Sequence, residues 1–282
     1  MEAAEAKEPA EPETEISAAE YLDNLRAGDS KFIGLSFPTI AAFGEHGAIV
    51  HYCADEKSNA TICLSAKADA GTGDEVSEGT FLLVDSGAHY LDGTTDVTRT
   101  IALGNLCHEM KEHYTLVMMG MLRLMNAKFT SETPASELDK IARNPLTDKG
   151  FDFNHSTGHG IGYLNVVHEA PVRISKKSNE FFFKPGMIVS DEPGVYIEGS
   201  HGIRIENDLC CMESESENLI QKNLIWKNLT WVPLENAAVC KELMTAEDIK
   251  YYNDYQSAVY EKISPHLDEK EREWLKETCS LI

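Results

Sequence analysis

Two aspartates in the stretch from Phe81 to Ile101 are the first residues with the potential for chemistry. The apolar run Phe81 to Val84 is typical of a buried strand, and Asp85 follows it directly. Asp96 comes 11 residues later. A buried carboxylate is costly unless its charge is compensated, so the pair predicts a cation site. The alternative is that Asp85 and Asp92 only serve the chemistry of the turn around Asp92-Gly93.

A glycine-rich segment downstream contains three histidines, His155, His159 and His168. The first two are spaced to share one helix face, but the glycines at 158, 160 and 162 argue against a helix. Glycines instead let the backbone approach a site closely and leave His159 free to project into it. The glycine spacing differs from that of a dinucleotide-binding loop, so no nucleotide site is predicted.

Two further acids follow strand-like sequence. Glu192 comes just after the apolar run Met187 to Ser190 and precedes a Pro-Gly turn. Further on, strict alternation places Arg204, Glu206 and Asp208 on one face of an expected strand. Such alternation is also typical of a solvated outer face, so the interpretation depends on the whole set.

Taken together, Asp85, Asp96, His159, Glu192 and Glu206 provide four carboxylates and one imidazole. Oxygen-rich ligation suits hard or borderline divalent ions such as Mn²⁺, whereas a structural zinc site would favour cysteine. Two divalent ions balance four carboxylates, while a single ion would leave the group strongly anionic. We therefore expect a two-metal hydrolytic centre for divalent ions of this kind.

The composition narrows the class of protein. The 282 residues are 42% hydrophobic, enough for a sizeable core. The net charge of −22, from 25 basic and 47 acidic residues, repels phosphate and anionic lipid, so neither nucleic acid nor a membrane is an expected partner. We see neither an apolar run of about 18 residues nor a signal-peptide pattern. Seven scattered cysteines without a C-x-x-C pair suit free thiols in the cytoplasm.

Helical and strand-like segments occur in mixed order, which predicts an α+β fold with helices on one face of a largely antiparallel sheet. Expected strands are Phe32–Phe37, Ala48–Tyr52 with His51, Met187–Ser190, Gly194–Ile197 and Gly202–Cys211. Expected helices are one capped by Ser17, His108–Phe129, one from Thr133 that ends before Asn144-Pro145, one capped by Thr245 and one from about Asp268. A tight hairpin centred on Asp92-Gly93 would place Asp85 opposite Thr100, so a wider loop or a bulge is predicted there.

In combination, the motifs resemble aminopeptidase P, the manganese-dependent Xaa-Pro aminopeptidase of the creatinase and methionine aminopeptidase superfamily, which has a pita-bread fold. The resemblance runs from about Glu13 to the C-terminus. The motifs that carry it, in the family's order, are G-A-I-V-H-Y, D-S-G-A-x-Y-x-D-G-T-T-D-V-T-R-T, H-x-T-G-H-G-I-G, V-H-E-x-P, D-E-P-G-V-Y and G-I-R-I-E-N. The helical segment 244–281 is similar to the terminal extension of the long-form members.

The resemblance implies a role for each candidate residue. Asp96 and Glu206 would bridge two metal ions, Asp85 would complete the shell of one ion, and His159 and Glu192 that of the other. A hydroxide between the ions would attack the carbonyl before proline, with Glu192 as the proton shuttle to the leaving imino nitrogen. The remaining residues would line or support the substrate site: His51, His155, His168, which would donate to the scissile carbonyl, and Arg204.

The implied substrates are peptides with proline at position two, and homodimerisation is left open. We expect three parts: an acidic tail at 1–14, a pita-bread catalytic domain at 15–234 and a packed helical extension at 235–282. The two domains that precede the catalytic domain in long-form members are expected to be missing. Two alternatives remain: a prolidase-like Xaa-Pro dipeptidase with the same ligands, and a non-catalytic pita-bread module that binds peptides or proteins.

Overall fold

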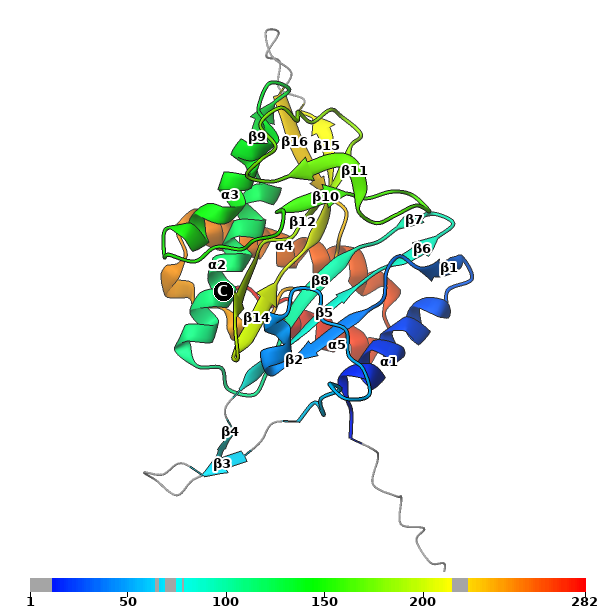
Figure 1. The fold of residues 1–282 in the computed structure, drawn as a ribbon, viewed down its shortest axis with the longest axis vertical. Helices are drawn as coiled ribbons and strands as arrows, with labels where there is room; N and C mark the ends of the chain where they lie inside the picture. Colours follow the sequence, from blue (N-terminus) through cyan, green and yellow to red (C-terminus); the bar gives the residue numbers. More distant parts are fainter. Residues whose placement is uncertain (1–11, 64–65, 69–74, 78, 215–222) are drawn as a thin grey trace, which may run out of the picture.

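The computed structural model describes residues 12–63, 66–68, 75–77, 79–214 and 223–282 (Figure 1). Most of the predicted acidic tail, residues 1–11, lies outside this part of the chain. Helices and strands alternate along the sequence, and the paired strands run antiparallel. The α+β class predicted from the sequence is therefore confirmed.

The helices begin at side-chain caps or after extended residues. Their bounds are α1 Glu15–Ala27, α2 His108–Met125, α3 Ala135–Thr147, α4 Ala246–Ile263 and α5 Glu269–Thr278. Thr245 caps α4 as predicted, and the last helix, α5, starts where it was predicted and is capped by Asp268. The predicted cap of α1 was wrong: Thr14 is the N-cap, and Ser17 occupies the third helical position, where its hydroxyl accepts from the Thr14 N–H at 2.8 Å.

Helix α3 continues past Pro145 to Thr147, so the predicted end before Asn144-Pro145 was wrong. Proline removes one backbone hydrogen bond from a helix, but here it lies in the last turn. Pro145 and the next residue, Leu146, are both buried, and Leu146 belongs to the main hydrophobic core. Burial of this last turn stabilises it against the proline.

The largest sheet among the described residues has six strands. Its order is β11 (Glu169–Ile174), β10 (Gly158–Gly160), β12 (Ile188–Asp191), β15 (Asn207–Glu213), β16 (Asn223–Asn228) and β9 (Lys128–Thr130). The other strands form four smaller sheets. They are β2 (Ile40–Phe43) with β5 (Thr80–Ser86) and β8 (Val97–Leu103); β1 (Phe32–Leu35) with β6 (Ala88–Tyr90) and β7 (Gly93–Thr94); β13 (Gly194–Ile197) with β14 (His201–Arg204); and β3 (Ala66–Ala68) with β4 (Glu75–Ser77).

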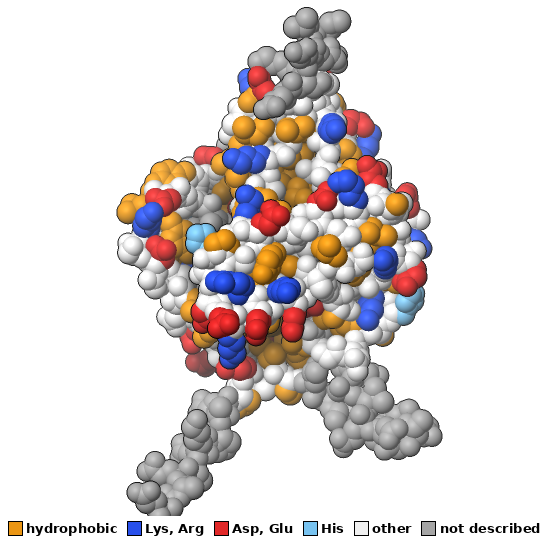
Figure 2. Space-filling model, turned by 180° about the vertical axis from the view of Figure 1, so that it is seen from behind, with side chains coloured by type: hydrophobic (Ala, Val, Ile, Leu, Met, Phe, Trp, Pro, Cys, Tyr) orange, Lys and Arg blue, Asp and Glu red, His pale blue; other side chains and the backbone are white. Residues whose placement is uncertain are grey.

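Helices α2 to α5 lie behind the strands in the view of Figure 1. The main core joins α2, α4 and α5 to β13 and β14, with Tyr114, Met121, Tyr252 and Ile203 fully buried within it. Figure 2 shows the reverse side of the molecule, where acidic and basic side chains are interspersed. No helix in the described ranges is long and apolar enough to cross a membrane.

The hairpin that carries Asp85 and Asp96 has one register throughout, so the predicted bulge was wrong. Asp85 pairs with Thr98, and the same register continues to the Tyr90–Gly93 pair. The turn is thus centred one residue earlier than predicted. Because Asp96 lies two residues before Thr98, the two aspartates are diagonal neighbours on one face of the ladder.

Gly87 permits the close approach of these strands. A Cβ atom at this position would lie 2.0 Å from the carbonyl oxygen of Thr95 and 2.4 Å from the hydroxyl of Ser36. Both distances are far below contact, so a side chain would force the strands apart.

The segment Ala48–Tyr52 is not a strand, contrary to prediction. Its first residue, Ala48, ends a short 3-10 helix, η1 (Gly44–Ala48), that packs against β14, and the rest is a turn. The contact is between glycines: a Cβ on Gly202 would lie 1.7 Å from the Gly47 carbonyl oxygen. This backbone contact with β14 holds the segment as a turn, with His51 exposed at its end.

The predicted strand Gly202–Cys211 is interrupted. β14 ends at Arg204 and β15 begins at Asn207, with Ile205 and Glu206 between them. Arg204, Glu206 and Asp208 are at most 6% exposed. The alternating polar residues therefore face the interior, which excludes the solvated outer face as the reason for their alternation.

Candidate metal centre

One cavity of about 890 Å³ is lined by every residue predicted as a metal ligand or as part of the substrate site. The predicted residues that line it are His51, Asp85, Asp96, His155, His159, His168, Glu192, Arg204 and Glu206. They come from separate segments: the β5–β8 ladder, the loop after η1, the strands β10 and β12 and their connections, and the junction of β14 and β15.

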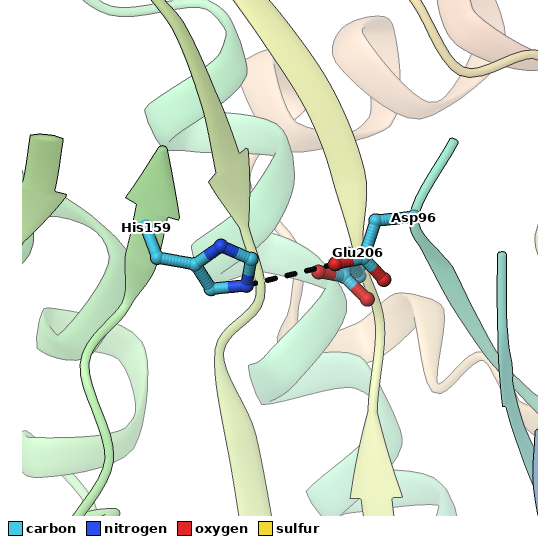
Figure 3. Close-up of side chains that lie close together, drawn as sticks. All are labelled: Asp96, His159 and Glu206. Atoms are coloured by element: carbon cyan, nitrogen blue, oxygen red, sulfur yellow. Dashed lines mark ion pairs between the residues drawn. The ribbon is translucent and has the colours of Figure 1, made fainter. Parts of the chain in front are cut away.

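Three of these residues place donor atoms close enough to share an ion. One ligand atom each of Asp96, His159 and Glu206 lies within 4.8 Å of the others. His159 projects from β10 toward the two carboxylates, which come from the other side of the cavity (Figure 3). Its Nε2 atom lies 3.6 Å from an Asp96 carboxylate oxygen and 3.3 Å from one of Glu192.

The tautomer of His159 is fixed by its neighbour. Its Nδ1 lies 3.1 Å from the carbonyl oxygen of Gly160, which can only accept, so Nδ1 carries the proton. Burial lowers the pKa of His159 to about 4, so the ring is neutral at pH 7. The lone pair of Nε2 therefore faces the oxygens of Asp96 and Glu192. That arrangement is repulsive unless a proton or cation lies between the groups.

The carboxyl groups show the same need for a cation. Burial, and then the charge of Glu206, raise the pKa of Asp96 well above its usual range. Burial and Glu206 likewise raise the pKa of Glu192, and burial and Asp85 raise the pKa of Glu206 to about 8. Carboxyl groups whose pKa values are raised by loss of hydration and by mutual repulsion are typical of functional sites.

Asp85 has one paired and one unpaired oxygen. Its Oδ2 accepts from the Arg204 guanidinium at 2.6 Å, whereas its buried Oδ1 has no hydrogen-bond partner within the described residues. An unpaired buried carboxylate oxygen is costly, and a divalent cation would satisfy it. With the Nε2 lone pair of His159, this oxygen shows that the residues present fit a metal centre.

Arg204 connects the carboxylates to a chain of hydrogen bonds. Its Nη1 donates to the Tyr196 hydroxyl at 3.0 Å, and that hydroxyl lies 2.9 Å from Nε2 of His155. His155 Nδ1 faces the Ser156 carbonyl at 2.8 Å, so Nδ1 is the donor and Nε2 accepts from Tyr196. Burial lowers the pKa of His155 to about 4, in keeping with a neutral ring. Both nitrogens of His155 are therefore engaged within the protein.

The other two histidines lie nearer the mouth of the cavity. His51 and His168 are both exposed, and the His168 ring packs edge-on against His159 with centroids 4.2 Å apart. Burial, and then the charge of His51, lower the pKa of His168. A neutral His168 can still donate one hydrogen bond to a group in the cavity.

Sequence reasoning missed three residues that hold the acids in place. The Thr98 hydroxyl donates to Glu206 at 2.6 Å, the Ser190 hydroxyl donates to Glu192 at 3.3 Å, and Tyr196 bridges Arg204 and His155. A signal for Tyr196 was present, because strand alternation places it on the same face as Glu192. Gly194 makes room for it: a Cβ there would lie 2.6 Å from the Tyr196 hydroxyl.

Known proteins share this fold and sequence. The chain matches the family described as metallopeptidase family M24 over residues 1–213, and the C-terminal region of that peptidase over residues 222–282. An aminopeptidase P1 from Lotus japonicus is 41% identical over 95% of this chain and 39% of its own length. An Xaa-Pro aminopeptidase from Caenorhabditis elegans is 38% identical over 95% of this chain and 42% of its own length. The chain thus spans about two fifths of the length of these relatives.

Solved structures agree with the sequence matches. A crystal structure of an X-prolyl aminopeptidase from Caenorhabditis elegans, described as a cytosolic enzyme with a di-nuclear active site, matches with a TM-score of 0.84 and 37% identity over 95% of this chain and 42% of that chain. An Xaa-Pro dipeptidase from Bacillus anthracis matches with a TM-score of 0.62 and 32% identity over 79% of this chain and 54% of that chain. The resemblance to aminopeptidase P and its pita-bread fold is thereby confirmed. This chain belongs to metallopeptidase family M24.

Proposed function

We propose that the chain is a metal-dependent aminopeptidase that releases the N-terminal residue of peptides with proline at position two. The observation that carries this proposal is the cavity in which Asp96, His159 and Glu206 bring their ligand atoms within 4.8 Å of one another. The names of the M24 relatives supply the substrate class.

Five residues would hold two divalent ions: Asp85, Asp96, His159, Glu192 and Glu206. We propose Mn²⁺ as the ion, because four of the five side chains offer oxygen. When bound, two such ions polarise a carbonyl oxygen and provide a nucleophile from water at neutral pH. The free state of all seven cysteines and the cytosolic relative support a cytoplasmic location.

The protein's own side chains would orient the substrate and handle the proton. His168 would donate to the carbonyl oxygen before proline as negative charge develops there. Glu192 would accept a proton at a carboxylate oxygen and deliver it to the proline nitrogen as the peptide bond breaks. Arg204, held by Tyr196 and His155, would keep the Asp85 carboxylate in position.

The test is hydrolysis of an Xaa-Pro-Yaa peptide and of an Xaa-Pro dipeptide, each with and without Mn²⁺, together with metal analysis. The proposal predicts cleavage of the longer peptide that depends on Mn²⁺. Cleavage confined to the dipeptide would show a prolidase-like dipeptidase, for which the likeness to the Bacillus anthracis enzyme is the supporting observation. Less than one bound ion per chain and no hydrolysis would indicate a non-catalytic binding module.

A further inference from the structure

Arg99 is a buried cation at the seam between the metal centre and the C-terminal helices. It lies on β8, is 7% exposed, and is not among the residues that line the cavity. Its guanidinium has hydrogen-bond acceptors on both sides of the seam. These acceptors are the carbonyl oxygens of Thr98, Glu206, Val232 and Pro233, the side-chain oxygen of Asn207 and the hydroxyl of Tyr255.

On the catalytic side, Arg99 fixes the backbone around Glu206. Its Nη1 donates to the carbonyl oxygens of Thr98 at 2.8 Å and Glu206 at 2.6 Å. The Glu206 N–H donates to the same Thr98 carbonyl at 3.1 Å, and the Thr98 hydroxyl donates to the Glu206 carboxylate at 2.6 Å. Because Glu206 lies in the break between β14 and β15, these contacts hold it where strand pairing does not.

On the other side, Arg99 binds the segment that leads into the C-terminal helices. Nε donates to the Pro233 carbonyl at 3.1 Å, and Nη2 donates to the Val232 carbonyl and the Tyr255 hydroxyl, both at 2.8 Å. The Tyr255 hydroxyl, on α4, donates in turn to the Val232 carbonyl at 2.7 Å. The ring of Tyr255 stacks on Trp231 with centroids 6.3 Å apart.

We propose that Arg99 and Tyr255 are positioning residues through which the C-terminal helices hold Glu206 in its metal-binding geometry. This inference rests on the proposed function, since it treats Glu206 as a ligand. The planar guanidinium of Arg99 offers five N–H donors. They are directed at acceptors near Glu206 and at acceptors in the segment that leads into the C-terminal helices. A lysine, with three donors at one point, cannot span both sides. The partners of a metal ligand commonly change metal affinity about 10- to 100-fold when they are removed.

Tyr255→Phe is the most direct perturbation, because it removes one hydroxyl and keeps the stacked ring. Its matched control is Tyr252→Phe on the same helix. Tyr252 is also fully buried, but its hydroxyl donates to Asn236 and accepts from Gln256 at 3.1 Å, without contact to Arg99. Both changes remove one buried hydroxyl from α4, so a general loss of helix stability would affect them equally.

The experiment is calorimetric titration of Mn²⁺ into the metal-free chain, with the melting temperature of each variant measured alongside. We expect Tyr255→Phe to weaken Mn²⁺ binding about tenfold and Arg99→Lys by about 10- to 100-fold. Tyr252→Phe should keep the affinity of the unsubstituted chain even where its melting temperature falls as far. If Arg99→Lys does not fold, the Mn²⁺ affinity of Tyr255→Phe alone tests the inference.

Equal Mn²⁺ affinity in folded Tyr255→Phe and the unsubstituted chain would overturn the inference while leaving the proposed function intact. An equal loss in Tyr252→Phe would also overturn it, because the effect would then be general. Failure of the unsubstituted chain to bind Mn²⁺ at all would overturn the proposed metal centre, and this inference with it.

Discussion

Binding of Mn²⁺ to the metal-free chain should release protons, and the structure sets the number. The pKa of Glu206 is raised to about 8 by burial and by Asp85, so at pH 7 this carboxyl is about 0.9 protonated. His159, with a pKa lowered to about 4, is already unprotonated at that pH and releases none. Asp96 and Glu192, whose pKa values are also raised, add to the total. We therefore expect a net release on the order of one proton per chain at pH 7.

The same pKa values set the direction in which proton release changes with pH, and the pH range of that change. A raised carboxyl pKa means that the metal must displace a proton below about pH 8 but not well above it. Near pH 9 the contribution of Glu206 should fall to about 0.1 proton. For each proton released, the apparent affinity for Mn²⁺ should rise about tenfold per pH unit between pH 6 and 7.

The assay is calorimetry of Mn²⁺ binding in two buffers with different enthalpies of ionisation, repeated at pH 7 and pH 9. The measurement at pH 9 serves as the comparison, because Glu206 is then largely ionised without metal and has little proton to release. Release of less than about 0.1 proton by the unsubstituted chain at pH 7 would refute the reasoning, since the carboxyls would then be ionised without metal.

Three further substitutions test the assigned metal ligands, the close packing of the strands at Gly87 and the positioning of His155. Asp96→Ala should abolish Mn²⁺-dependent hydrolysis, as measured on an Xaa-Pro-Yaa peptide; full turnover would count against the assigned site. Gly87→Ala should destabilise the chain by about 1–3 kcal/mol in urea unfolding, because its Cβ would lie 2.0 Å from the Thr95 carbonyl oxygen, and unchanged stability would contradict that close contact. Arg143→Lys should lower kcat/KM about tenfold while the chain stays folded by circular dichroism. Arg143 donates to the His155 carbonyl at 2.8 Å as part of a forked contact that lysine cannot make. An unchanged rate would show that this contact does not position His155.

The candidate site could be predicted from the sequence because its residues follow strand-like runs and glycine turns. Asp85, Glu192 and Glu206 each occur where an apolar run ends or alternates, and the structure gathers them in one cavity. For the strand around Glu206, pattern alone could not separate a solvated face from a buried polar face. The prediction rested on the whole set of acids, since four carboxylates in one group favour cations, and the burial of Glu206 in the structure then excluded a solvated face.

The missed features depend on contacts between distant parts of the chain. Ala48–Tyr52 has the composition of a strand, but the approach of Gly47 to Gly202 makes it a turn. Pro145 should end a helix by local rules, and burial of Leu146 in the core keeps the last turn. The supporting role of Tyr255 could not be foreseen, because nothing in its local sequence indicates that it reaches Arg99.

The hydrogen bond between Thr98 and Glu206 joins residues 108 positions apart, and this separation has a kinetic consequence. The chain must close a long loop before Thr98 and Glu206 meet, and such a contact costs more closure entropy than a local one. The metal-binding geometry should therefore form late, after the local contacts of the fold. Mn²⁺ should then slow unfolding and leave the refolding rate unchanged, so that the ion extends the lifetime of the native state without guiding its formation.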